Sequence, residues 1–311
     1  ARAGAPLMLG VIGDLVQDVV VWQREAVRPG TDTASDVFMA RGGSAANVAA
    51  FAASRYPTRF IGCVGDDLGG FVLGRDLEER GVDVRLQTRG RTGMIVVLID
   101  PSGERTMFPS RGASELLTAI EPAWLDGLEL LHVTAYSFAS GSTPDAVGSA
   151  IEVVRAAGGR VSLDVSSVGL VQHFGLERFL DLLERIRPDF VSANSSEAEF
   201  LGLTAGDAAG ATLGRLPGTV LLARAGAQPT RVFAGGRVVA SVPVPPVEVV
   251  RDLTGAGDAF NAGFLTDYLA RGWDPVANVE AGHALASKVI ASPGAAEAAA
   301  GSGAIDSPPG S

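Results

Sequence analysis

The residues best placed to do chemistry lie in one short stretch, Gly255-Ala256-Gly257-Asp258. It follows a run rich in Val and Pro and leads into small and apolar residues over 259–269, where we expect a helix. A Gly-x-Gly turn that enters a helix leaves several backbone N–H groups unpaired, beside the positive end of the helix dipole. The stretch therefore predicts a site for a phosphate or another anion.

The carboxylate of Asp258 follows this anion site directly, and it would repel a bound phosphate. One interpretation is structural, because an acidic residue in the first turn of a helix is stabilised by the helix dipole. The other is that the carboxylate serves a reaction at the anion. The stretch alone leaves both interpretations open.

The framework that must position this stretch is an α/β fold. Apolar runs typical of buried strands alternate with helical patterns along most of the chain, which predicts a mostly parallel sheet with helices on both faces. The expected strands are 7–12, 59–64, 128–133, 160–164, 190–193 and 219–223, and the expected helices are 41–54, 71–80, 144–157, 177–187 and 196–202.

Two β-rich segments, 16–41 and 91–110, interrupt this alternation. A two-stranded ribbon is marginally stable in water, so neither segment would fold alone, but together they could form one small sheet. Such a sheet over the C-terminal edge of a parallel sheet is positioned to be a lid. We therefore expect an α/β core of residues 1–15, 42–90 and 111–311 with an inserted β lid.

Composition excludes several classes of protein. The net charge of −10 argues against a nucleic-acid or membrane partner, and no apolar run is long enough to span a membrane. A single cysteine, Cys63, favours a reducing compartment, and without a signal peptide we expect a cytoplasmic protein. The only lysine, Lys288, lies outside any P-loop pattern, and the dinucleotide-binding glycine motif is missing.

Three segments in order resemble the ribokinase-like (PfkB) family of carbohydrate and nucleoside kinases. Gly42-Gly43-Ser-Ala-Ala-Asn47 resembles the first family signature, and Asp252-Leu-Thr-Gly-Ala-Gly-Asp258 looks like the second. Between them, Gly65-Asp-Asp-Leu-Gly69, followed by Gly-Val-Asp83, is similar to a recurring family stretch. The resemblance covers about residues 7–295 and implies the ribokinase-like fold.

This resemblance implies phosphorylation of a hydroxyl by ATP with Mg²⁺, with Asp258 as the general base. The residues suit that chemistry, because the acceptor hydroxyl must lose a proton while the transferred phosphoryl group needs N–H donors. The backbone amides of Gly255, Ala256 and Gly257 would supply those donors. For the acceptor, the resemblance points to Asp18, Gly42, Gly43 and Asn47, with Asp14 nearby, because carboxylates and amides bind hydroxyl groups.

Asn194 and Glu197 resemble the Asn-x-x-Glu motif that organises Mg²⁺ in the family. The same spacing is that of a helix capping box, and the two roles are compatible. Because Mg²⁺ keeps several of its waters, Glu197 would act on the ion through water.

The chain departs from ribokinases in places that concern the substrates. Val16 replaces an asparagine usual there, and Gly-Glu-Arg105 is closer to the hairpin of fructokinase-like and keto-deoxy-gluconate-kinase-like members, so Arg105 could meet a polar or acidic sugar. Arg224 and Gly226 belong to an altered adenine loop, and His283 falls where a ribokinase asparagine lies against adenine. A core or capping role explains His283 equally well.

The resemblance also leaves choices open. Asp252 and Thr254 match two ligand positions of a monovalent cation, which suggests activation by K⁺. The favoured function is an ATP-dependent sugar kinase; the alternatives are a nucleoside kinase of the adenosine type and a sugar-binding regulator without turnover. Aromatic residues, which would stack on a nucleoside base, make up only 6% of the chain, which favours a sugar. The lid edge invites a homodimer.

Overall fold

The computed structural model describes residues 7–248, 250–251 and 253–291 of the 311-residue chain. Asp252, one of the two side chains expected to bind a monovalent cation, lies outside the described residues. Within the described part of the chain, no helix combines the length and apolar character that crossing a membrane requires.

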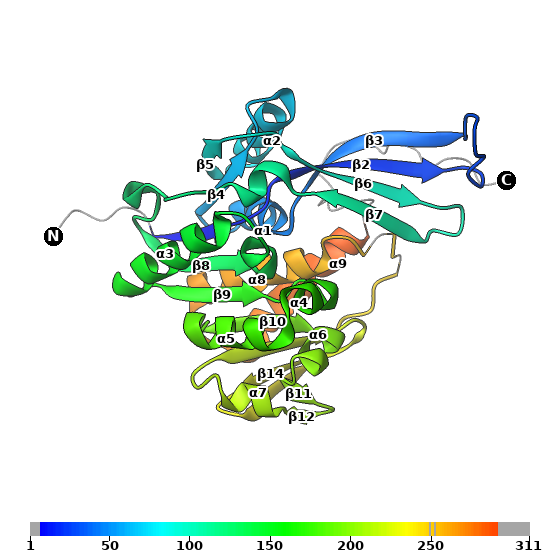
Figure 1. The fold of residues 1–311 in the computed structure, drawn as a ribbon. Helices are drawn as coiled ribbons and strands as arrows, with labels where there is room; N and C mark the ends of the chain where they lie inside the picture. The colour runs from blue at the N-terminus through cyan, green and yellow to red at the C-terminus, as the bar shows by residue number, and fades with distance from the viewer. Residues whose placement is uncertain (1–6, 249, 252, 292–311) are drawn as a thin grey trace.

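The centre of the fold is a nine-stranded sheet with the order β15-β14-β13-β10-β9-β8-β1-β4-β5 (Figure 1). Every neighbouring pair from β13 to β5 is parallel, and β13, β14 and β15 pair antiparallel. The strands are β1 (Met8–Ile12), β4 (Thr58–Val64), β5 (Asp83–Thr88), β8 (Leu128–Thr134), β9 (Arg160–Asp164), β10 (Phe190–Asn194), β13 (Val220–Ala225), β14 (Gln228–Ala234) and β15 (Arg237–Val242). This confirms the predicted fold class.

Helices cover both faces of the sheet, and a separate apolar core lies under each set. One core includes side chains from α3 to α7, and the other includes side chains from α1, α2, α8 and α9. The helices are α1 (Ser44–Ala53), α2 (Leu68–Glu79), α3 (Thr143–Ala156), α4 (Val168–Phe174), α5 (Leu176–Ile186), α6 (Ser195–Phe200), α7 (Ala211–Gly214), α8 (Ala256–Arg271) and α9 (Pro275–Ile290). Short 3-10 helices lie at 112–115, 122–124 and 135–138. The two-residue strands β11 (Thr204–Ala205) and β12 (Ala208–Ala209) pair antiparallel in a small separate ribbon.

The two β-rich segments do pair with each other, in a four-stranded sheet of order β3-β2-β6-β7. Its strands are β2 (Val16–Gln23), β3 (Ser35–Gly42), β6 (Gly93–Ile99) and β7 (Arg105–Ser110). Two antiparallel hairpins, β2–β3 and β6–β7, join through a parallel β2–β6 contact, and the sheet projects from one end of the core (Figure 1). Gly42 is the last residue of β3, so the small sheet leads directly into α1.

Several elements were missed in the sequence, among them strand β5 and helix α9. Helix α2 begins at Leu68, three residues before the expected start, because Asp67 caps it by accepting a 2.9 Å hydrogen bond from the Gly70 amide. Helix α4 was not expected; Ser167 caps it, and Val171 is its fully buried side chain.

Candidate active site

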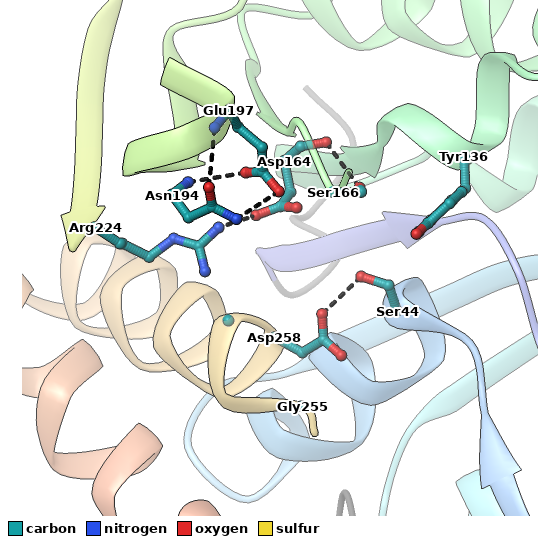
Figure 2. A pocket seen from close by; sticks show the side chains of 10 residues that line it. Ser44, Tyr136, Asp164, Ser166, Asn194, Glu197, Arg224, Gly255 and Asp258 are labelled. Atoms are coloured by element: carbon teal, nitrogen blue, oxygen red, sulfur yellow. Dashed lines mark hydrogen bonds and ion pairs between the residues drawn. The ribbon is translucent and has the colours of Figure 1, made fainter. Parts of the chain in front are cut away.

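A polar cavity of about 280 Å³ lies at the C-terminal edge of the parallel strands. This is the edge at which open α/β sheets bind ligands. Figure 2 shows its two sides: Asp258 and Ser44 lie on one, and a cluster of charged and amide side chains lies on the other. The lining residues are Ser44, Tyr136, Asp164, Ser166, Asn194, Glu197, Arg224, Gly255, Gly257 and Asp258.

The Gly-x-Gly turn begins helix α8, as predicted. Gly255 is the N-cap residue with φ of 77°, a left-handed conformation that favours glycine. A Cβ atom on Gly257 would lie 2.3 Å from Nη1 of Arg224, so the missing side chain lets this guanidinium approach the start of α8. The N-terminus of α8, with the positive end of its dipole, therefore faces the cavity beside the guanidinium of Arg224. The Ala256 amide at this end donates to the carbonyl oxygen of Leu253 at 3.2 Å.

Asp258 lies in the first turn of α8 and is held by two side chains of α1. Ser44 Oγ donates to its Oδ1 at 2.6 Å, and Asn47 Nδ2 donates to its Oδ2 at 2.9 Å. Burial raises the pKa of Asp258 to about 7, with further increases from the charges of Asp164 and Asp14, while the two hydrogen bonds lower it. A carboxyl group whose pKa lies near neutrality suits a general base.

The residues predicted to bind the acceptor lie together on the small-sheet side of Asp258. The Asp18 carboxyl lies against Gly42, whose added Cβ would be 2.1 Å from Asp18 Oδ1. That oxygen is buried and has no hydrogen-bond partner among the residues that the structure describes. Burial, and then the charge of Asp14, raise the pKa of Asp18 to about 6. An orphan carboxylate oxygen of this kind is suited to a ligand hydroxyl.

Asp14 and Gly43 form the base of this acceptor side. Gly43 has φ of 101°, and a Cβ atom there would lie 2.4 Å from the carbonyl oxygen of Asp14. Asp14 is buried, and its Oδ1 accepts from the amide of Ala45 at 3.2 Å. Glycine at this position therefore allows the end of β1 and the start of α1 to approach closely.

Across the cavity, Asn194 and Glu197 form the capping box of α6. The Glu197 amide donates to Asn194 Oδ1 at 2.9 Å, and the Asn194 amide donates to Glu197 Oε2 at 2.8 Å. Glu197 is buried, and its pKa is raised by that burial and by the charge of Asp164. Within the described part of the chain, no three His, Cys, Asp or Glu side chains come together as a complete metal site.

Asp164, at the end of β9, is a site residue that sequence reasoning missed. Its Oδ2 accepts from Arg224 Nη2 at 2.9 Å and from Asn261 Nδ2 at 2.8 Å. The available signal was an acidic residue ending a buried strand at the same sheet edge as Asn194. Tyr136, Ser166 and Ser44, which also line the cavity, stood next to recognised elements but carried no distinctive spacing.

The residues predicted for the adenine side are dispersed. Arg224 lines the cavity, whereas Gly226 forms the turn between β13 and β14 with φ of 61°. His283 is buried within α9, where its Nε2 lies 2.9 Å from the hydroxyl of Thr230 and its ring packs on Phe260. The structure thus gives His283 a core environment outside the cavity lining.

Arg105 and Thr254 connect the small sheet to the turn before α8. The guanidinium of Arg105, on β7, donates a hydrogen bond to the hydroxyl of Thr254. This contact joins positions 149 residues apart in the chain. Arg105 is therefore close to the turn that precedes α8.

Comparison with known proteins places the chain among the phosphotransferases. The sequence matches the model of the pfkB family carbohydrate kinases over residues 7–300, and the chain belongs to that family. It is 31% identical over 273 residues to a fructokinase of Klebsiella pneumoniae, with 84% of each chain covered. The resemblance inferred from the motifs is therefore confirmed, and the protein is a sugar or nucleoside kinase.

Solved structures share the fold. The adenosine kinase from Sinorhizobium meliloti superposes with a TM-score of 0.79 at 23% identity, covering 93% of this chain and 95% of that one. A putative ribokinase II from E. coli, in complex with ATP and Mg²⁺, gives 0.77 at 20% identity, covering 94% of each. ATP is the substrate of pfkB kinases.

Proposed function

We propose that the protein phosphorylates a sugar hydroxyl with ATP, and that Asp258 is the general base. The observation that carries this proposal is the position of Asp258 between the N-terminus of α8 and the acceptor side, with a pKa of about 7. A carboxyl group at that pKa is substantially ionised at neutral pH and can take a proton.

The proposed reaction uses both sides of the cavity. The acceptor hydroxyl donates its proton to Asp258 as its oxygen attacks the γ-phosphorus, and the bond to the ADP oxygen breaks. The amides of Gly255 and Gly257 stabilise the charge on the transferred phosphoryl group, whereas the Ala256 amide, expected to join them, donates to the Leu253 carbonyl oxygen at 3.2 Å. Asp18 and Asn47 hold neighbouring hydroxyls of the acceptor, because Asp18 Oδ1 is a buried acceptor without a partner in the described part of the chain.

The donor set opposite Asp258 fits Mg²⁺. Asp164 and Glu197 are neighbouring buried carboxyl groups, and a hard cation that keeps its waters needs few protein ligands. When bound with ATP, Mg²⁺ would neutralise charge on the phosphates. Glu197 would hold the waters of the ion, while Asn194 and the α6 capping box fix the direction of its carboxylate.

Replacing Glu197 by glutamine separates capping from metal binding, since glutamine also serves in a capping box. We expect Glu197→Gln to keep the stability of the fold but to raise the Mg²⁺ concentration for half-maximal activity by about 10–100-fold. Glu199→Gln removes an exposed charge from the same helix and should leave this concentration unchanged. A normal Mg²⁺ requirement in Glu197→Gln would limit Glu197 to capping.

Two features favour a sugar as the acceptor. The hairpin carries Glu104-Arg105, as in fructokinase-like and keto-deoxy-gluconate-kinase-like proteins, and the cavity lining contains Tyr136 as its one aromatic residue among those described. ADP release should be measured with ATP and a panel of pentoses, ketohexoses, keto-deoxy sugar acids and nucleosides. We expect turnover with a sugar; turnover with nucleosides alone would favour the nucleoside kinase, and binding without turnover would favour the regulator.

We further propose that a monovalent cation binds beside the anion-binding turn, with Asp252 and Thr254 among its ligands. A bound cation would strengthen the positive field at the N-terminus of α8. We expect the rate in K⁺ buffer to exceed the rate in Na⁺ buffer at equal ionic strength. Identical rates in the two buffers would contradict a K⁺-selective site.

The small sheet is proposed as a lid and as a dimer contact. Asp18 of this sheet lies against Gly42, and Arg105 contacts Thr254 before α8. Its strands β3 and β7 expose the large apolar side chains of Val37, Met39 and Phe108. Exposed apolar side chains on an edge strand favour pairing with another chain. Sedimentation of the full chain tests this: a dimer is expected, and a monomer at assay concentration would contradict it.

A further inference from the structure

A buried arginine lies directly behind the proposed acceptor side. Arg41 is in β3, immediately before Gly42, and only 6% of its side chain is exposed. Its Nε donates to Asp76 Oδ2, on α2, at 2.8 Å, and its Nη1 donates to Asn47 Oδ1 at 2.7 Å. Burying a cation is costly unless partners satisfy it, so these two partners explain how this charge is tolerated.

The contact between Arg41 and Asn47 fixes the orientation of the Asn47 amide. Because the amide oxygen accepts from the guanidinium, the Nδ2 group must face the other way, toward Asp258 Oδ2 at 2.9 Å. A flipped amide would put its oxygen against the carboxylate of Asp258 and its N–H groups against the cation of Arg41. Both contacts would be repulsive, so Arg41 selects the orientation in which Asn47 donates to Asp258.

Arg41 also contributes its charge to a group of carboxylates. Its charge is felt at Asp18, whose pKa it lowers, and Arg41 interacts electrostatically with Asp258. Asp14 and Asp164 face Asp258 with like charge, and Arg224 lines the same cavity from the nucleotide side. Arg41 is one cation on the acceptor side of this group, and Arg111, whose Nη1 lies 3.8 Å from Asp14 Oδ2, is another.

We propose that Arg41 is a positioning residue for the acceptor site, which directs the Asn47 amide onto Asp258 while Asp76 holds its guanidinium in place. This inference rests on the proposed role of Asp258. Arg41 itself acts through Asn47 and through its charge, and Asp76 has a second partner in Arg80, whose Nε lies 3.1 Å from Asp76 Oδ2.

The arginine pair on Asp76 supplies a matched experiment. Arg41→Met removes the contact to Asn47, whereas Arg80→Met removes the other partner of Asp76 and leaves Arg41 and Asn47 joined. We expect Arg41→Met to lower kcat with the best acceptor by about 10–100-fold, since misplacement of about 1 Å can cost 10²-fold. The KM for ATP should not change, and Arg80→Met should behave as wild type in both respects.

The pH dependence of kcat/KM for the acceptor separates orientation from charge. Without the cation, Asp18 and Asp258 hold their protons more tightly, so the acidic limb of Arg41→Met should move to higher pH. Arg41→Lys keeps the charge without the paired donor geometry, so it should restore the acidic limb while kcat stays low. A limb that does not move in Arg41→Met would overturn the electrostatic part of the proposal.

A double-mutant cycle tests whether Arg41 acts through Asn47. At a pH above the acidic limb of both variants, the Arg41→Met, Asn47→Ala double variant should be no slower than Asn47→Ala alone, because the orientation of the amide no longer matters there. Additive losses, or equal losses in Arg41→Met and Arg80→Met, would overturn the proposal. Asp258→Asn distinguishes a failure of the proposed base from a failure of the role of Arg41. If Asp258→Asn keeps turnover, the proposed base is wrong. If Asp258→Asn is inactive but Arg41→Met is normal, only the role of Arg41 is contradicted.

Discussion

We expect Asp258→Asn to lower kcat by about 10²–10⁴-fold, the usual worth of a positioned general base, while both substrates still bind. Asparagine is nearly isosteric and can keep hydrogen bonds to α1, but it cannot take a proton from the acceptor. The reason for the size of the effect is the placement of the Asp258 carboxyl, which Ser44 and Asn47 hold from α1. The measurement is steady-state ADP release at saturating ATP and acceptor.

Asp145→Asn is the control for this substitution. Asp145 is exposed in the first turn of α3, so its replacement makes the same chemical change at a helix N-terminus away from the cavity. Near-normal turnover is expected for this control. If Asp258→Asn were equally active, Asp258 would be only a helix-terminal acid stabilised by the dipole.

Gly43→Ala should have the second large effect, on stability and on activity together. An alanine there must adopt the left-handed φ of 101°, and its Cβ would lie 2.4 Å from the Asp14 carbonyl oxygen. Backbone strain of about 1–3 kcal/mol and overpacking of a similar size should lower the free energy of unfolding by roughly 3 kcal/mol or more. Moving α1 away from β1 would also displace Asn47, so acceptor turnover should fall.

Gly103→Ala isolates the backbone part of this effect. Gly103 also has a left-handed φ, of 88°, but an added Cβ would meet nothing within 4 Å. Chemical denaturation should show a small loss of stability for this variant and a much larger one for Gly43→Ala. Equal losses in the two variants would mean that the close approach of β1 and α1 is not a constraint.

The framework and the two central motifs were predictable from the sequence because their signals are local. Alternating strand and helix patterns place Asp14 and Asn194 at the ends of parallel strands, and such ends meet at one sheet edge. The glycine turn likewise predicts the start of helix α8 from four consecutive residues. The two β-rich segments could be matched to one sheet because neither is stable alone.

Residues whose importance depends on distant partners were not predictable. In the sequence, Asp164 is only an acidic residue at the end of a strand. Its partners Arg224 and Asn261, 60 and 97 residues away, contact it only in the folded protein. Arg41, in strand β3, gives no signal in the sequence, since its partner Asp76 lies 35 residues away on helix α2. For Glu197, the capping pattern and the proposed metal role coincide, and the structure displays the capping box itself.

The resemblance carried least information where the chain departs from its family. Gly226 lies in a hairpin turn, and His283 packs in the core against Thr230 and Phe260. The hydrogen bond with Thr230 satisfies Nε2, one of the two ring nitrogens of His283, without any nucleotide. Motif position alone could not distinguish that environment from an adenine contact.

The central claim, that Asp258 takes the acceptor proton, is tested most directly by the pH dependence of single-turnover phosphoryl transfer. The carboxylate is the active form, so the rate should rise with pH through the Asp258 pKa of about 7. The free energy of unfolding should change in the opposite direction. Folding raises the pKa of Asp258 from 3.8 to about 7, so its contribution to stability is lost as pH rises through about 7.

The account therefore predicts an acidic limb near pH 7 in the wild type and its disappearance from the slow residual rate of Asp258→Asn. The same substitution should stabilise the fold relative to wild type above that pH. Asp18→Asn should keep the limb, since the pKa of Asp18 is lower, about 6. A wild-type rate that does not change from about pH 5 to about pH 9, or an unchanged limb in Asp258→Asn, would contradict the claim.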